Sequence, residues 1–259
     1  MKGMIWGLAL MLAPTAASAH TSYLKPNSFG SAEANAVTIE ASFTEDFLRP
    51  EIPVESQDWH LYRPDGLRDT YDNVVVLRQM TVLESDLTEP GTYRFTTGER
   101  LGRTSTQARI DGQWRPLEPG AAAPAGAPTR QSQTATVADV YVTKGAPSDA
   151  VLGIAVGHLA IRPLTHPSAI FLDDGFRFRV AFDGAPLANQ DVNVYRDGGI
   201  YDETPFHQVF RTDSNGELHL SFDRPGAYLI MTRHSADAPA GSATQIRSYT
   251  TSLTFEVTR

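Results

Sequence analysis

The sequence contains no cysteine in its 259 residues, which excludes disulfide bonds, thiolate metal sites and cysteine nucleophiles together. Basic residues are also scarce, because 22 Lys and Arg stand against 30 Asp and Glu and give a formal net charge of -8. Proteins that bind nucleic acid through its phosphates usually carry a basic patch, so the sequence predicts no nucleic-acid partner. Any metal or catalytic chemistry must therefore depend on histidine, carboxylate, methionine or hydroxyl groups.

Helical periodicity is almost absent, and apolar residues recur at every second position instead. The alternation is clear at residues 37–43, 176–182, 218–222 and 253–257. Clusters of turn-forming residues, such as Ser214-Asn215-Gly216, separate the alternating runs. The pattern predicts an all-β protein built of antiparallel, Ig-like or prealbumin-like β-sandwiches. We expect under about a tenth of the mature chain to be helical.

The chain also lacks an apolar run long enough to span a membrane. Residues 4–12 are apolar, but this run is shorter than the roughly 20 residues that a spanning helix requires. Lys2 precedes it and Ala17-Ser18-Ala19 follows it, which is the pattern of a cleaved signal peptide. We expect residues 1–19 to be removed, leaving a periplasmic or secreted protein without a membrane span. Cleavage after Ala19 makes His20 the first residue of the mature chain, with a free α-amine.

One segment interrupts the alternating pattern. Residues 119–128 (PGAAAPAGAP) have neither periodicity nor large apolar side chains, so we expect a flexible loop there. We assign the N-terminal sandwich to residues 20–149, with this loop inside it, and the C-terminal sandwich to residues 150–259. The alternative is a domain boundary at the loop itself.

The second half of the chain carries a recognisable set of turns and strands, at residues 183–188 (DGAPLA), 212–217 (TDSNGE) and 224–228 (RPGAY). This arrangement resembles prealbumin-like and carboxypeptidase-regulatory-like sandwiches. The resemblance implies a fold for the C-terminal half. It implies no function, because such sandwiches serve many roles.

Further motifs are spread over nearly the whole mature chain: Ala19-His20, Leu24-Lys25-Pro26, residues 157–164 (GHLAIRPL), His166-Pro167 and residues 251–257 (TSLTFEV). Together they resemble a bacterial family of exported proteins of unknown function, some of whose members accompany nickel and cobalt uptake transporters. The resemblance implies a metal-related role in the periplasm, with an envelope metal transporter or receptor as a partner.

The seven histidines are the obvious metal ligands in a chain without cysteine. His20 differs from the others because an N-terminal histidine can bind a metal through its α-amine and its ring nitrogen together. One further histidine would complete a three-nitrogen histidine brace, a geometry that suits Cu(II) or Ni(II). His158 and His234 are the candidates for this partner, because the family that the chain resembles has histidine at both positions.

The sequence therefore predicts a non-enzymatic periplasmic protein that binds nickel, cobalt or copper for uptake or storage. It contains no G-x-S-x-G, P-loop or G-x-G-x-x-G motif that would indicate a common class of enzyme. Two alternatives stay open. One is a metal-free sandwich that binds an envelope protein or a polysaccharide, and the other is a copper oxygenase that uses the same brace.

Overall fold

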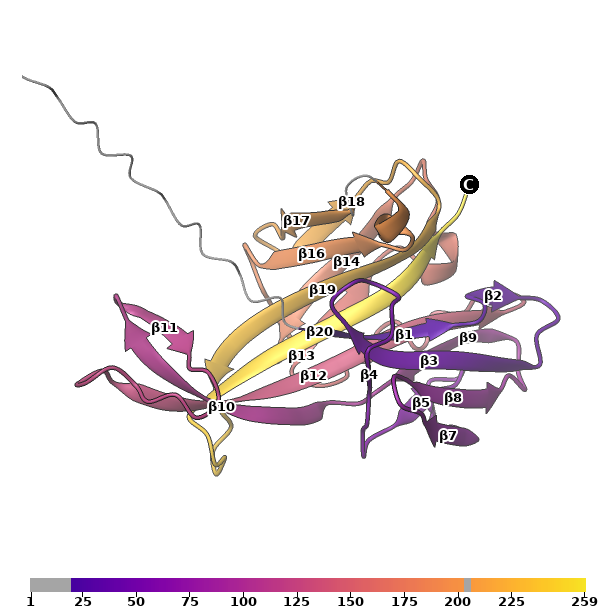
Figure 1. Ribbon diagram of the computed structural model, residues 1–259. Coiled ribbons are helices and arrows are strands. Elements are labelled where there is room, and N and C mark those ends of the chain that lie inside the picture. Colours follow the sequence, from indigo (N-terminus) through magenta and orange to yellow (C-terminus); the bar gives the residue numbers. More distant parts are fainter. Residues whose placement is uncertain (1–19, 203–205) are drawn as a thin grey trace, which may run out of the picture.

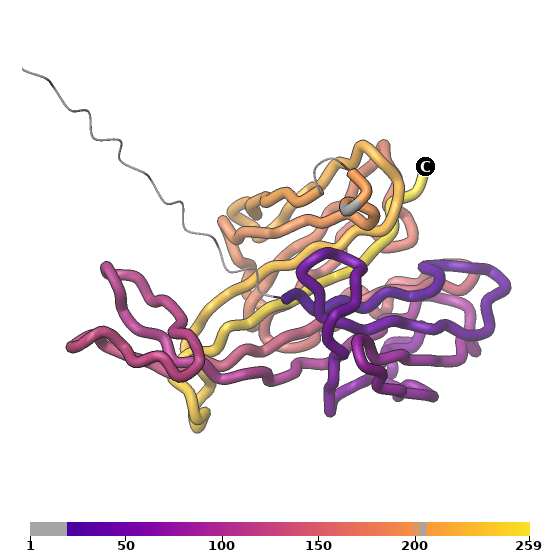
Figure 2. Tube along the Cα trace, viewed as in Figure 1, coloured from indigo at the N-terminus to yellow at the C-terminus, as the bar shows by residue number. Residues whose placement is uncertain are grey.

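The structure, a computed structural model, describes residues 20–202 and 206–259 (Figures 1 and 2). These residues form strands β1 to β20 and two short 3-10 turns, without an α-helix in the described ranges. The prediction of an all-β sandwich protein is therefore confirmed. The predicted signal peptide, residues 1–19, lies outside the described residues. In the part of the chain that is described, no helix has the length and hydropathy needed to cross a membrane.

The described residues form three sheets. The first has the order β1 (Thr21–Pro26), β3 (Ala36–Thr44), β8 (Thr81–Asp86) and β7 (Asn73–Val76), with β4 (Ile52–Pro53) also paired to β3. The third has the order β13 (Leu159–Pro163), β14 (Phe176–Phe182) and β15 (Ala185–Pro186), with β18 (Glu217–Leu220) also paired to β14. The 3-10 turns are η1 (Pro167–Ala169) and η2 (Gly199–Tyr201).

The second sheet is the largest and runs through the whole molecule (Figure 1). Its order is β17 (His207–Arg211), β16 (Asp191–Arg196), β19 (Gly226–Asp237), β20 (Ile246–Val257), β12 (Thr129–Lys144), β9 (Gly91–Thr96), β5 (His60–Tyr62) and β6 (Arg68–Asp69). Strands β2 (Gly30–Ser31) and β10 (Arg100–Ile110) also pair with β12, and β11 (Gln113–Pro116) pairs with β10.

Strand β12 contributes side chains to both hydrophobic cores, because successive residues of a strand point to opposite faces. Ala138, Val140 and Val142 pack into the N-terminal core, and Ala135 and Tyr141 pack into the C-terminal core. The two sandwiches thus lie on either side of one long strand. The boundary that we assigned near residue 150 stays a prediction.

The alternating runs form the strands that the sequence predicts. Val37, Ile39 and Ala41 are buried in the N-terminal core, and Phe176 and Phe178 are buried in the C-terminal core. Burial of each large apolar side chain contributes about 1.5–3 kcal/mol. Strand β12 departs from the antiparallel pattern, because it pairs parallel with β20, from Ser132↔Ile246 to Val140↔Thr254, and also with β2.

A buried ion pair crosses from β9 to β12. Nη2 of Arg94 lies 2.5 Å from Oδ2 of Asp139, and the two side chains are only 1% and 5% exposed. The other terminal nitrogen of Arg94 donates to the carbonyl of Ile154, which lies in the segment that connects the two sandwiches. Arg94 thereby holds the connecting segment against the large sheet.

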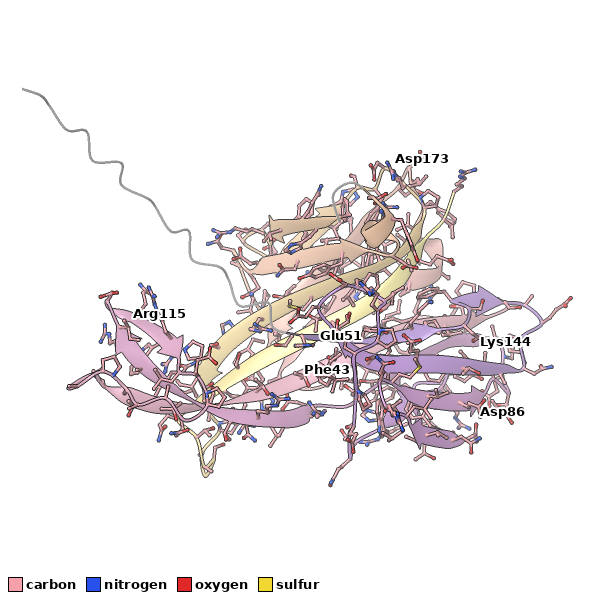
Figure 3. All side chains as sticks on the ribbon, viewed as in Figure 1. Phe43, Glu51, Asp86, Arg115, Lys144 and Asp173 are labelled. Carbon is pink, nitrogen blue, oxygen red and sulfur yellow. The ribbon has the colours of Figure 1, made fainter. Side chains whose placement is uncertain are left out.

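Strands β10 and β11 form an arm that extends away from both cores, and Figure 3 labels Arg115 on it. The segment 117–128 connects β11 to β12 without forming a strand, and most of its side chains are exposed. The loop expected at residues 119–128 lies within this segment.

We expect a nonspecific protease to cut first within residues 121–128. Small residues with Pro and Gly bury little surface, so local opening there costs little free energy. Limited proteolysis followed by mass spectrometry locates the first cut. A first cut inside Phe176–Phe182, where Phe176 and Phe178 are buried, would contradict the prediction.

Candidate metal centre

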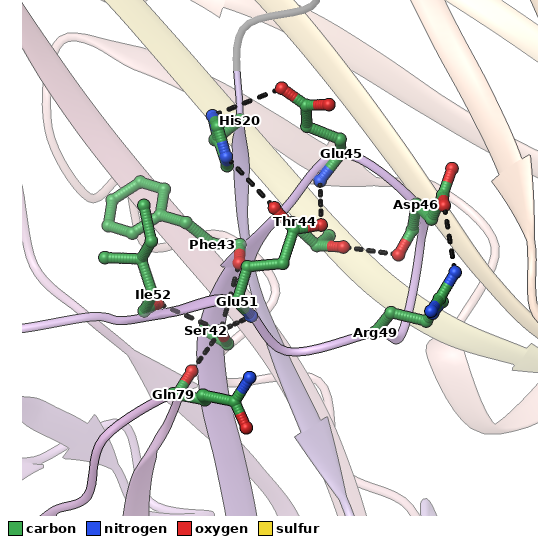
Figure 4. A network of polar contacts seen from close by, with 10 residues as sticks. All are labelled: His20, Ser42, Phe43, Thr44, Glu45, Asp46, Arg49, Glu51, Ile52 and Gln79. Carbon is green, nitrogen blue, oxygen red and sulfur yellow. Dashed lines mark hydrogen bonds and ion pairs between the residues drawn. The ribbon is translucent and has the colours of Figure 1, made fainter.

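His20 lies directly before β1, beside two glutamates (Figure 4). The register of β1 with β3 pairs Thr21 with Thr44, which brings the start of β1 next to the end of β3. The loop 45–51 then leads back to β4, and it carries Glu45 at its start and Glu51 at its end. Strand pairing therefore gathers these three side chains from positions that are distant in the sequence.

The imidazole of His20 faces a carboxylate with each of its nitrogens. Nε2 lies 3.0 Å from Oε2 of Glu51, and Nδ1 lies 3.7 Å from Oε1 of Glu45. The side chains of His20, Glu45 and Glu51 are 37%, 50% and 36% exposed. The cluster is therefore open to a solute from one side.

The backbone around Glu51 holds its carboxylate in place. Its N–H donates to Oγ of Ser42 at 3.2 Å, and the Ser42 hydroxyl donates to the carbonyl of Gln79 at 2.7 Å. Oε1 of Glu51 accepts a hydrogen bond of 3.1 Å from the backbone N–H of Glu45. Ser42 is fully buried, so this anchor is shielded from water. The other oxygen of Glu51 is left facing His20.

His158 pairs with a different carboxylate, that of Glu99. Both the backbone N–H and Nδ1 of His158 bind this carboxylate, at 2.8 and 2.9 Å. Gly157 has a φ of +69°, and a side chain there would place its Cβ 2.7 Å from Oε2 of Glu99. The glycine therefore permits the close approach of the backbone to Glu99.

His158 and His234 lie beside the same pair of aromatic rings. The ring of His158 is 5.1 Å from that of Tyr249, and the ring of His234 is 4.8 Å from that of Phe182. Phe182 and Tyr249 contact each other with their centroids 5.0 Å apart. The two histidines are thus brought into one aromatic cluster, which the sequence did not indicate.

His20 belongs to the other face of the large sheet. Oγ of Ser252 in β20 donates to the carbonyl of Ser22 in β1, at 2.6 Å. Tyr249 and Ser252 are three positions apart, so their side chains point to opposite faces of β20. His20 therefore has two carboxylates beside its ring where we expected His158 or His234. A histidine brace that includes His158 or His234 stays the alternative to a site in which a carboxylate is the third donor.

Within residues 20–202 and 206–259, no three His, Asp or Glu side chains are already arranged to hold a metal ion. The sequence pointed to His20 but not to Glu45, Glu51 and Glu99, which make the polar contacts of His20 and His158. A loop of acidic residues after a strand was the signal that could have indicated the first two.

Two other histidines, His219 and His60, make hydrogen bonds to backbone carbonyls of the protein. His219 is exposed, and its Nε2 donates to the carbonyl of Asp174 at 3.0 Å. His60 is 2% exposed. Its Nδ1 lies 2.6 Å from the carbonyl of Asp58, and because a carbonyl only accepts, this nitrogen carries the proton.

Burial lowers the pKa of His60 below its usual value of 6.5. In acid, the unfolded chain takes up a proton that the folded chain resists, so stability should fall as the pH drops from 6.5 toward the lowered value. Denaturant unfolding on both sides of that window measures the effect. His60→Asn should show a smaller fall, and His219→Ala should keep the full one. An equal fall in His60→Asn and the native chain would contradict the assignment.

The family described as "Domain of unknown function (DUF4198)" matches residues 17–236, which include all three candidate histidines. The chain belongs to this family. The description names no activity and makes no reference to nickel or cobalt, so the uptake role expected from the resemblance has no support here. No curated protein matches the sequence.

The solved structures that match the chain are distant from it. A DUF4785 family protein from Legionella pneumophila matches 81% of this chain with 10% identity and a TM-score of 0.25, and the chain spans about half of that protein, 50%. The D0-D1 domain of intimin matches over 92% of this chain and 99% of its own, with 13% identity and a TM-score of 0.22. Trypsin-activated alpha-2-macroglobulin from Escherichia coli matches 91% of this chain over 16% of its own, with 12% identity and a TM-score of 0.24.

Proposed function

We propose that the exported chain is a non-enzymatic periplasmic protein that binds a divalent transition metal at His20. The observation that supports this most directly is the position of the His20 ring, between the carboxylates of Glu45 and Glu51 at the open start of β1. Cleavage after Ala19 adds the α-amine of the same residue to these donors. The site then offers two nitrogens and one or two carboxylate oxygens.

The two ring nitrogens suit different tasks. The 3.7 Å between Nδ1 and Oε1 of Glu45 is too long for a hydrogen bond. It is wide enough for an ion bonded to both atoms at about 2.0–2.2 Å. Nδ1 is also the ring nitrogen that closes a six-membered chelate with the α-amine. Glu51, at Nε2, would orient the ring, as carboxylates beside metal-bound histidines commonly do.

This donor set favours the later first-row metals. Divalent ions at sites of nitrogen and oxygen donors bind in the order Co²⁺ < Ni²⁺ < Cu²⁺. We therefore expect Cu(II) to bind most tightly in solution and nickel and cobalt more weakly. Delivery to an envelope transporter or receptor, or storage, is the role that we assign to the bound metal.

Calorimetric titration of the mature chain with Cu(II), Ni(II) and Co(II) tests the proposal. We expect one ion per chain, with an affinity that falls in acid because the amine and the imidazole must lose their protons to bind. Absence of stoichiometric binding for all three ions would refute a metal-binding function.

A further inference from the structure

Strand β7 leaves an apolar edge uncovered at the end of the first sheet. It pairs with β8 on one side and is the last strand in the sheet order. Val74, Val75, Val76 and Leu77 are 42%, 51%, 51% and 49% exposed, so both faces of this segment meet solvent. Edge strands of soluble proteins are usually protected by charges, Pro or bulges, and an uncovered apolar edge is typical of a surface that pairs with another strand.

Hydrogen bonding determines which backbone groups the edge presents. The N–H of Leu77 donates to the carbonyl of Met80 at 2.8 Å, within the hairpin to β8. Successive residues of an antiparallel strand point their backbone N–H and C=O groups to opposite sides. The backbone groups of Val75, like those of Leu77, therefore point to β8. The N–H and C=O groups of Val74 and Val76 then point to the open side.

The charges that flank the valines are of opposite sign and lie symmetrically about Val75. Asp72 precedes the strand and Arg78 follows it. Oδ2 of Asp72 accepts a hydrogen bond of 2.7 Å from the backbone N–H of Asp86, so Oδ1 is the oxygen that would face a partner. We propose that this edge pairs antiparallel with the same edge of a second copy of the chain, with Val75 on the two-fold axis. In that register Asp72 of each copy lies opposite Arg78 of the other.

The register selected by the charges agrees with the register selected by the backbone. Centring on Val75 places Val74 opposite Val76 of the second copy, and these are the residues whose backbone groups are free to bond across the edge. A shift of the centre to Val74 or Val76 keeps the backbone pairing but removes Asp72 from Arg78. A second copy therefore covers the apolar side chains, binds the free backbone groups and pairs the charges in one arrangement, as an isologous two-fold interface requires.

Cysteine cross-linking tests this pairing directly, because the native chain has no cysteine. Opposed residues of a non-hydrogen-bonded antiparallel pair have Cα atoms about 4.5 Å apart, which lies within the range of a disulfide. Val75→Cys should therefore form a covalent dimer under mild oxidation, seen on a non-reducing gel. The matched control is Val209→Cys, since Val209 is 56% exposed on the edge strand β17. Equal cross-linking of the two variants would overturn the proposal.

Charge exchange supplies a second measurement. Arg78→Asp and Asp72→Arg should each weaken self-association about tenfold, because each sets two like-charge pairs across the interface. An equimolar mixture of the two variants should associate as tightly as the native chain, since opposite charges then meet at both ends. Sedimentation velocity in the presence of a chelator measures these affinities independently of the metal site. A native chain that stays monomeric at every concentration, or a mixture no tighter than the separate variants, would overturn the proposal.

Discussion

Replacing Asp139 by alanine should lower the free energy of unfolding by about 3–5 kcal/mol, the usual cost of removing one partner of a buried ion pair. Arg94 is 1% exposed, so its guanidinium would remain buried without a counter-charge. Burial alone would lower the pKa of Arg94, and the neighbouring Asp139 raises it above its usual range. Arg94 therefore stays charged in the native chain, and because a guanidinium does not lose its proton in proteins, Arg94 cannot relieve the loss of Asp139 by becoming neutral.

Denaturant unfolding of matched variants measures this cost. Asp191→Ala removes the partner of Arg211, a pair with side chains 63% and 52% exposed, and should cost under about 1 kcal/mol. The double variant Arg94→Met/Asp139→Leu should be more stable than Asp139→Ala, because it leaves no buried charge. A loss in Asp139→Ala as small as that in Asp191→Ala would show that water reaches Arg94.

Strands such as β3 and β14 were predictable from the sequence because each of them buries mainly one face. The alternation through Val37, Ile39 and Ala41 follows from that local requirement, and so does the alternation through Phe176 and Phe178. The parallel pairing of β12 with β20 was not predictable, because parallel and antiparallel strands both place alternate residues on opposite faces. The participation of β12 in both cores depends on the same pairing.

The candidate site was predictable only in part. His20 was identified through the cleavage pattern before it, which is local in the sequence. Glu45 and Glu51 reach it through the pairing of Thr21 with Thr44, and strand register is a tertiary property. The uncovered edge at β7 did have a local signal that the sequence analysis did not use. Residues 74–77 are apolar without alternation and lie between charges of opposite sign.

Adding one alanine before His20 should weaken Cu(II) or Ni(II) binding by orders of magnitude. The extension converts the α-amine into a peptide nitrogen, so the chelate formed by amine and ring is lost while the imidazole and both glutamates stay in place. His20→Ala should weaken binding similarly, and His219→Ala should leave it unchanged, because His219 is bonded to a backbone carbonyl elsewhere. Calorimetric titration compares the variants, and equal affinity of the native and extended chains would show that the amine is not a ligand.

The remaining ligand is identified by two further substitutions. Glu45→Gln should weaken binding more than Glu51→Gln, because Glu45 faces Nδ1, the nitrogen that chelates with the amine, whereas Glu51 faces Nε2. His158→Ala and His234→Ala should bind as the native chain does, since both rings contact the aromatic cluster on the other face of β20. A histidine brace predicts the reverse, with a loss of affinity in one of these histidine variants and none in Glu45→Gln. The same titrations therefore decide whether the third donor to the metal is a carboxylate or a second imidazole.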